Sequence, residues 1–320
     1  MQELSQRVLR GDRTAISRAI SLVENHGIGS QQLLADLFPH TGKAYVIGIT
    51  GPLGTGKSTL ADRLIKAYRA RAKRVAVLAV DPSSPISGGA LLGDRVRMLE
   101  HSLDSGVYIR SMASRGDEGG LSKSARDAVR ILDAAGFDVI FVETVGIGQT
   151  EAEVAGIADS VVVVLMPELG DEIQATKAGL MEIGDIFAVN KSDLPGVDNV
   201  LYNLSSVLSH KDGGWKQMPI KVSAKTGEGM DDLMKALDAR ESFLKTSGTA
   251  LGRDRQRLSE ELIELVTDSV ANELRQRLLN DEEFLTIVDK LIKRETDPGS
   301  ASSEFFRKYW ASRRSTTQDA

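Results

Sequence analysis

The residue types and spacing best suited to chemistry lie in a glycine-rich stretch between an apolar run and a helical pattern. Such a loop points backbone N–H groups at the β-phosphate of a nucleoside triphosphate, and the start of the following helix adds a positive dipole. Lys57 is expected to reach the β- and γ-phosphate oxygens, and the Ser58 hydroxyl to bind Mg²⁺. The sequence therefore predicts a nucleotide site whose phosphate-binding residues are Gly51, Leu53, Gly54, Thr55, Gly56, Lys57, Ser58 and Thr59.

Two further motifs, each following an apolar strand, favour guanine as the base. Residues 190–193 read Asn-Lys-Ser-Asp, and residues 223–225 read Ser-Ala-Lys. The Asp193 carboxylate can accept from both N1–H and the 2-amino group of guanine, and adenine offers neither donor there. The Asn190 amide suits the O6/N7 edge, and the aliphatic stems of two lysines can cover the ring faces. We expect the base to be held by Asn190, Lys191, Asp193, Ser223, Ala224 and Lys225.

Carboxylates near two strand ends are candidates for holding a magnesium ion, which prefers oxygen ligands and takes only a few of them from protein. Asp81 and Asp94 flank a loop and could bind the ion directly or through water. For Asp94, a helix N-cap or a partner for the adjacent arginine is the alternative role. Glu143 stands where most guanine-nucleotide switches carry aspartate, and the Gly146 N–H can sense the γ-phosphate. The expected metal site is Ser58, Asp81, Asp94 and Glu143.

The expected reaction is the in-line attack of water on the γ-phosphate, with Lys57 and Mg²⁺ stabilising the developing charge. Ile147 occupies the position where Ras-like proteins carry a water-orienting glutamine, so the intrinsic rate is expected to be slow. Gln149 and Lys177 are candidates for completing the site when a partner moves these segments, and surface packing is the alternative role for both. The expected catalytic set is Lys57, Asp81, Asp94, Glu143, Gln149 and Lys177.

Composition limits the classes of function. The chain has 320 residues, a net charge of −5 and no block of lysine and arginine, which argues against a nucleic-acid partner. It has no cysteine, and its four histidines show no ligand spacing, which argues against a thiolate nucleophile or a zinc site. No run approaches the roughly 20 apolar residues of a membrane span, and residues 1–11 lack the apolar core of a secretory signal. We expect a cytoplasmic protein without membrane contact.

Apolar runs that alternate with helical patterns predict the fold. Seven runs rich in valine and isoleucine show no polar alternation, as expected for strands buried on both faces of a mostly parallel sheet. They are 44–50, 75–80, 107–112, 139–142, 160–166, 186–189 and 220–222. The expected fold class is therefore α/β, a P-loop NTPase with a mostly parallel sheet flanked by helices and with helical extensions at both ends.

Three parts are expected along the chain: a helical extension at 1–42, a P-loop GTPase domain at 43–245, and a helical extension with a tail at 246–320. In the last part, a long helical stretch at 253–294 carries an apolar stripe. This stripe either packs on its own domain or forms a dimer interface. We expect the helix to end at 297–300, and the polar tail after it to be mobile.

In combination, five motifs closely resemble those of the MeaB/ArgK family, and the resemblance covers nearly the whole chain. It implies that Lys57 and the four metal-site residues form the phosphate and magnesium site. It also implies that 146–153 is a second switch and that 167–177 is a third switch, which couples nucleotide state to a partner. Leu53 departs from the proline of many relatives. The motifs are Gly-Pro-Leu-Gly-Thr-Gly-Lys-Ser-Thr at 51–59, Asp-Pro-Ser-Ser-Pro at 81–85, Gly-Asp-Arg-Val-Arg-Met at 93–98, Glu-Thr-Val-Gly-Ile-Gly-Gln-Thr-Glu at 143–151 and Met-Pro-Glu-Leu-Gly-Asp-Glu-Ile-Gln-Ala-Thr-Lys at 166–177.

Members of this family are GTPase metallochaperones of adenosylcobalamin-dependent acyl-CoA mutases. The resemblance therefore implies GTP, GDP and Mg²⁺ as ligands, a mutase of the methylmalonyl-CoA mutase type as partner, and a homodimer through the C-terminal helix. The implied function is to gate cofactor loading and to protect or reactivate the mutase. Direct cobalamin binding is not expected, because the Asp-x-His-x-x-Gly signature is missing. The alternatives are a small-molecule kinase or ATPase, disfavoured by the guanine motifs, and a nickel-insertion GTPase, disfavoured by the lack of cysteine.

Overall fold

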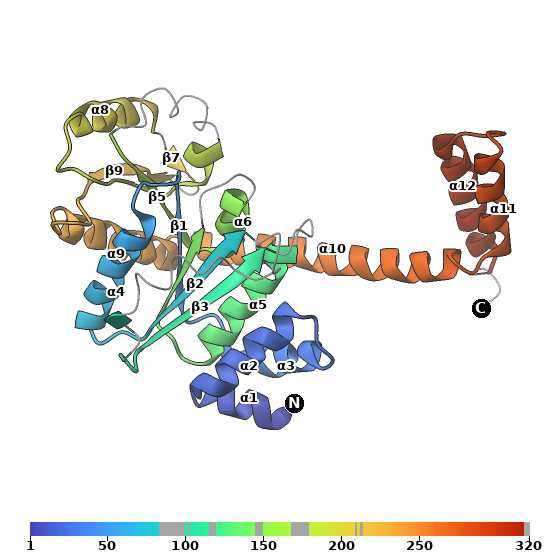
Figure 1. The fold of residues 1–320 in the computed structure, drawn as a ribbon, viewed down its shortest axis with the longest axis horizontal. Coiled ribbons are helices and arrows are strands. Elements are labelled where there is room, and N and C mark those ends of the chain that lie inside the picture. The colour runs from blue at the N-terminus through green and yellow to red at the C-terminus, as the bar shows by residue number, and fades with distance from the viewer. Residues whose placement is uncertain are drawn as a thin grey trace. The chain divides into compact units, whose positions relative to one another are not determined.

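The computed structural model describes residues 1–82, 100–101, 103–114, 120–144, 150–167, 179–208, 210–211 and 214–316. The chain divides into two compact units, Met1–Leu251 and Gly252–Ala320. The first unit contains a seven-stranded sheet with helices around it, and the second consists of helices (Figure 1). No helix in the described part of the chain combines the length and the hydrophobicity that a membrane span requires.

All seven strands of the sheet run parallel, in the order β3-β2-β4-β1-β5-β6-β9. Every residue of β1, β4, β5 and β6 is buried, as expected for strands covered on both faces. This confirms the predicted α/β fold with a mostly parallel sheet. The strand bounds are β1 Tyr45–Thr50, β2 Val75–Pro82, β3 Val107–Ser114, β4 Val139–Thr144, β5 Ser160–Leu165, β6 Ile186–Val189 and β9 Met218–Lys221.

Alternate side chains of the strands belong to two separate apolar cores. In β2, Ala76 and Leu78 lie in one core, and Val75 and Val77 lie in the other. Helices α5, α6 and α8 close the first core, and α4 and α9 close the second. Because helices cover both faces, polar groups become available to a ligand at the carboxyl ends of the strands. The helix bounds are α4 Lys57–Ala70, α5 Gly120–Ala134, α6 Thr150–Ile157, α8 Val197–Val207 and α9 Met230–Thr246.

The N-terminal segment forms helices, as its periodicity predicts, and α2 and α3 contact α5. Asp133 of α5 then accepts from the backbone N–H groups of Gly42, at 2.5 Å, and of Ala44, at 3.0 Å. These bonds fix the entry of the chain into β1, so the N-terminal helices belong to the same compact unit as the sheet. Their bounds are α1 Gln2–Leu9, α2 Arg13–Glu24, α3 Ser30–Leu37 and the 3-10 helix η1 Phe38–His40.

A short antiparallel hairpin of β7 (His210–Lys211) and β8 (Trp215–Lys216) is missing from the sequence-based prediction. The Trp215 indole N–H donates to the Asp185 carbonyl oxygen at 3.0 Å, just before β6. The guanidinium of the buried Arg240 donates to the Asp185 carboxylate at 2.9 Å and lies over the Trp215 ring. Breaking such a buried pair costs about 3–5 kcal/mol, because the remaining charge stays desolvated. The hairpin is thereby fixed beside the strand that leads to Asn190.

The C-terminal unit differs from its prediction in two places. The predicted helical stretch at 253–294 is interrupted after residue 278, and Asp281 begins the next helix by accepting from the Phe284 N–H at 2.9 Å. Where a polar tail was predicted, Pro298–Thr316 forms a helix that Asp297 caps, by accepting from the N–H groups of Gly299 and Ser300 at 3.0 Å. The end at 297–300 agrees with the sequence-based expectation, whereas the break before Asp281 was missed because the apolar periodicity continues across it. The bounds are α10 Thr249–Leu278, α11 Glu282–Ile292 and α12 Pro298–Thr316.

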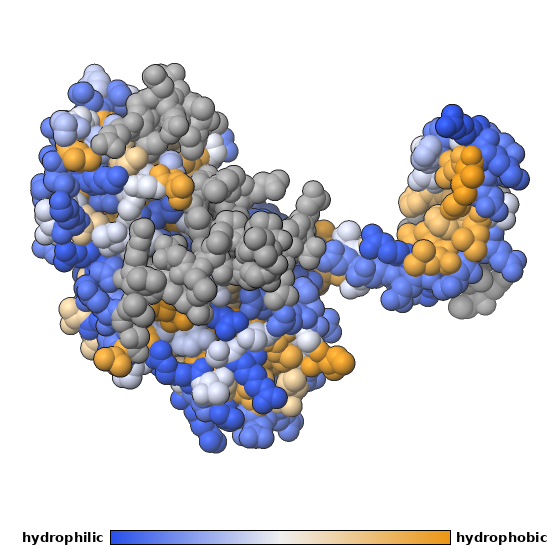
Figure 2. All heavy atoms as spheres, viewed as in Figure 1, coloured by the Kyte–Doolittle hydropathy of each residue, from blue (hydrophilic) through white to orange (hydrophobic). Residues whose placement is uncertain are grey.

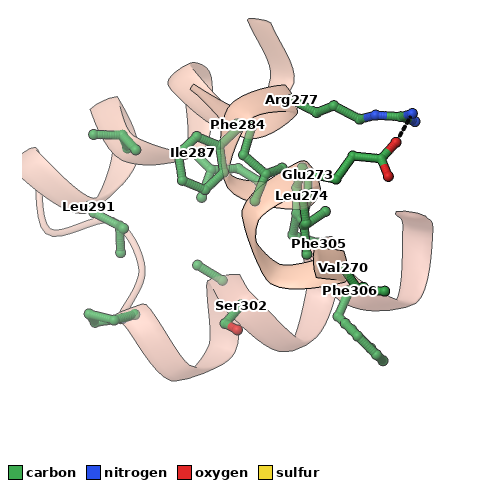
Figure 3. A pocket seen from close by; sticks show the side chains of 14 residues that line it. Val270, Glu273, Leu274, Arg277, Phe284, Ile287, Leu291, Ser302, Phe305 and Phe306 are labelled. Carbon is green, nitrogen blue, oxygen red and sulfur yellow. Dashed lines mark hydrogen bonds and ion pairs between the residues drawn. The ribbon is translucent and has the colours of Figure 1, made fainter. Parts of the chain in front are cut away.

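Hydrophobic residues gather on one face of the C-terminal unit (Figure 2). Phe284 of α11 and Phe305 of α12 pack edge to face, with their ring centroids 5.8 Å apart. A cavity of about 510 Å³ lies among α10, α11 and α12, and most of the side chains that line it are apolar (Figure 3). This small unit therefore leaves part of its apolar surface uncovered.

Candidate functional site

The glycine-rich loop follows β1 and leads into α4, as its sequence predicts. Two of its glycines are required by their surroundings. Gly51 has φ of 136°, and a Cβ there would lie 2.2 Å from the carbonyl oxygen of Val164 in β5. Gly56 has φ of 89°, and its Cβ would lie 2.5 Å from the Asn190 amide nitrogen. The loop therefore approaches its neighbours more closely than any other residue type would allow.

Lys57 is folded over this loop. Its Nζ donates to the carbonyl oxygens of Gly51 at 2.8 Å and Pro52 at 3.0 Å, and only 6% of the residue is exposed. The N-cap of α4 is Gly56, which makes no side-chain cap hydrogen bond. A glycine N-cap has no side chain that would compete with an anion at the start of the helix, beside the lysine charge. The arrangement suits the phosphates of a nucleotide.

Ser58 and Glu143 lie together beneath the loop. The Ser58 hydroxyl donates to Glu143 Oε1 at 2.6 Å, and both residues are buried. Parallel pairing of β1 with β4, in which Ile49 is opposite Glu143, brings the two residues together. Oxygen atoms of these types fit a hard cation such as Mg²⁺. Among the described residues, no group of three or more histidine, cysteine and acidic side chains could hold a metal.

The rest of the predicted catalytic set, Asp81, Asp94, Gln149 and Lys177, stays a prediction, because the structure does not describe these side chains. The structure describes only the backbone of Asp81, which pairs with Ala113 near the end of β2. Glu153, at the end of the second switch that the resemblance implies, lies on α6, and burial raises the pKa of its carboxyl. The predicted site residues Asp94, Gly146, Gln149 and Lys177 lie outside the described part of the chain.

Asn190 connects the glycine-rich loop to the residue 223–225 loop, which we call the base loop. Its side-chain nitrogen donates to the Thr55 carbonyl oxygen at 2.8 Å, and its side-chain oxygen accepts from the Ala224 N–H at 2.9 Å. The residue is buried. The sequence suggested a base contact for Asn190 and did not predict this bridging role. The small residue Gly56 at the start of α4, which Asn190 contacts, is the sequence feature that could have suggested it.

Asp193 lies exposed beside the base loop. The Ser223 hydroxyl donates to Asp193 Oδ1 at 2.9 Å, and this bond orients the carboxylate. Lys191, at φ of 59°, contacts the sulfur of Met166 at 3.1 Å through its Nζ, and Lys225 is exposed. The predicted base residues are thus gathered at the carboxyl ends of β6 and β9, close to the glycine-rich loop. An exposed, oriented carboxylate can accept from two adjacent N–H donors of one ligand.

The family described as methylmalonyl Co-A mutase-associated GTPase MeaB matches residues 16–278. A relative named as a GTPase in Pyrococcus horikoshii is 46% identical over 307 residues, which are 94% of this chain and 96% of that protein. GTPase ArgK of Escherichia coli is 34% identical over 294 residues, 89% of this chain and 88% of that one. A solved structure of LAO/AO transport system kinase superposes with a TM-score of 0.69 at 28% identity, covering 96% of this chain and 97% of the other. This chain is therefore a member of the MeaB family of GTPases.

Proposed function

We propose that this GTPase serves an adenosylcobalamin-dependent acyl-CoA mutase of the methylmalonyl-CoA mutase type. In this proposal, GTP binding and hydrolysis gate the loading of the cofactor and protect or reactivate the mutase, while cobalamin stays with the mutase. The observation that carries the proposal is the match to a mutase-associated GTPase family over residues 16–278.

We place GTP at the carboxyl ends of the strands, with its phosphates in the 51–58 loop. Lys57 would exchange its two backbone carbonyl partners for phosphate oxygens, where its charge stabilises the transition state. Ser58 and Glu143 would hold Mg²⁺, which neutralises phosphate charge when bound. Asp81, Asp94, Gln149 and Lys177 remain candidates for the rest of the catalytic site.

The base site that we propose selects guanine through Asp193. Its carboxylate would accept from guanine N1–H and the 2-amino group, while Asn190 keeps the base loop beside the phosphates. This arrangement disfavours the ATP-dependent kinase alternative, because adenine would leave the carboxylate without donors. The nickel-insertion alternative gains no support from the described residues, which contain no metal-binding cluster.

Asp193→Asn should change the base preference from guanine to xanthine. The amide can donate to the C2 carbonyl of xanthine but repels the guanine amino group, so we expect affinity for GDP to fall by about 100-fold and affinity for xanthosine diphosphate to rise. Competition binding measures both. Asp198→Asn is the matched control, because Asp198 is 86% exposed and belongs to α8, outside the base motifs. A wild-type protein that prefers ADP, or an Asp193→Asn variant that keeps its guanine preference, would contradict this base site.

The cognate methylmalonyl-CoA mutase should accelerate GTP hydrolysis by at least about 10-fold, equivalent to about 1.4 kcal/mol of barrier lowering. The reason is that Ile147 leaves the water-orienting position without a polar side chain, so the free protein is expected to be slow. Single-turnover hydrolysis with and without mutase measures the effect. Lys57→Ala should abolish GTP hydrolysis both with and without mutase. Lys73→Ala, which removes an exposed ion pair with Asp138, should leave both hydrolysis rates unchanged. Equal rates with and without mutase would refute the coupling.

We also propose a homodimer through the C-terminal helices. Leu262 and Val266 of α10 are 62% and 54% exposed, and the cavity among α10, α11 and α12 is apolar (Figure 3). Apolar surface of this kind is typical of an interface. The partner that we propose for this surface is a second copy of the chain, and the molecular mass in solution tests this.

Light scattering of the full chain at micromolar concentration should give the mass of a dimer. Leu262→Glu with Val266→Glu should give monomers that still bind GDP, because two charges cannot be buried in an apolar interface. Ala271→Glu is the control, since this exposed residue lies nine positions from Leu262, on about the opposite side of α10. A monomeric wild-type protein would exclude the proposed dimer.

A further inference from the structure

A cationic side chain outside the nucleotide motifs holds the base loop. Arg63 lies on α4, the helix that begins with Lys57. Its Nε donates to the carbonyl oxygen of Ala224 at 2.9 Å, and its Nη2 donates to that of Lys225, also at 2.9 Å. The forked guanidinium therefore spans two consecutive peptide groups of the base loop, a geometry that a lysine cannot reproduce.

In the described part of the chain, the other hydrogen bonds of the base loop join it to the segment that follows β6 or stay within its own turn. Asn190 accepts from the Ala224 N–H, and the Ser223 backbone bonds within the turn, donating to Glu228 at 2.9 Å and accepting from Gly227 at 2.7 Å. These bonds shape the turn and attach one end of it to β6. Arg63 adds the attachment to α4, the helix that follows the phosphate loop.

We propose that Arg63 is a positioning residue that fixes the base loop against α4 and thereby sets how long guanine nucleotides remain bound. The inference rests on the guanine site proposed above. Arg63 does not need to touch the nucleotide. It lies six residues after Lys57, about 9 Å along the helix axis, so a rigid helix connects the phosphate end of the site to the base end.

Arg63 should affect the rate of nucleotide release and not the rate of the chemical step. Loss of the two hydrogen bonds would let the base loop move away from a bound base, and release would become faster. The contacts of Lys57 with its loop and of Ser58 with Glu143 do not involve Arg63. The rate of hydrolysis at saturating GTP should therefore stay unchanged.

Stopped-flow release of GDP carrying a fluorescent group on its ribose tests this role. We expect release from Arg63→Ala to be about 10-fold faster than from the wild type, which corresponds to about 1.4 kcal/mol. Arg63→Lys should be intermediate, because an ammonium group keeps the charge but not the fork. For both variants, the single-turnover rate at saturating GTP should remain within about twofold of the wild type, a separation that a general loss of structure would not produce.

Arg71→Ala is the matched control. Arg71 follows α4 and donates to both carboxylate oxygens of Asp238, at 2.7 and 2.9 Å. Arg71→Ala therefore also removes a guanidinium group that connects this helix to another element. Its partner belongs to α9 and not to the base loop. We expect Arg71→Ala to release GDP at the wild-type rate. If Arg63→Ala released GDP no faster than Arg71→Ala, the positioning role would be overturned.

The Asp193→Asn variant separates this inference from the base site on which it rests. A shift of that variant toward xanthine nucleotides, together with faster release from Arg63→Ala, supports both. The same shift with unchanged release overturns the role of Arg63 and leaves the base site intact. An Asp193→Asn variant that keeps its guanine preference overturns the base site, and the inference about Arg63 with it.

Discussion

One buried amide, that of Asn190, imposes the constraint on which the nucleotide site depends. It donates to Thr55 in the phosphate loop and accepts from Ala224 in the base loop, so two segments far apart in the sequence are held at a fixed separation. The amide fits only because Gly56 has no Cβ. A buried amide that lost one of these partners would cost about 1–3 kcal/mol, because its polar atoms are shielded from water. The two loops are therefore joined through a single side chain.

The parallel sheet makes this bridge possible. Strands β1, β5, β6 and β9 are neighbours and run in the same direction, so the loops that follow them meet at one edge. The same pairing places Glu143, at the end of β4, beside Ser58. Helices on both faces leave this edge as the place where polar side chains can meet a ligand. The fold thus determines which residues can act together before any of their chemistry is considered.

The strands and the loop were predictable because they depend on local patterns. Runs of valine and isoleucine identify buried strands whatever their partners are, and Lys57 and Ser58 follow a glycine pattern with its own geometry. Contacts between distant residues were not predictable in this way. The bridge made by Asn190, the hairpin held by Arg240, and the attachment of the base loop to Arg63 each depend on the packed structure. In the C-terminal unit, the helix break that Asp281 caps was not predictable, because the apolar periodicity continues across it.

A crystal structure of the chain with GDP and Mg²⁺ tests the central claim, that one bridged site binds phosphates and base together. The account predicts that the Lys57 amine leaves the carbonyl oxygens of Gly51 and Pro52 for the β-phosphate, and that the guanine N1–H and 2-amino group meet Asp193. It also predicts that Asn190 keeps its hydrogen bonds to Thr55 and Ala224. A guanine ring bound away from Asp193, or an Asn190 side chain turned away from either loop, would contradict it.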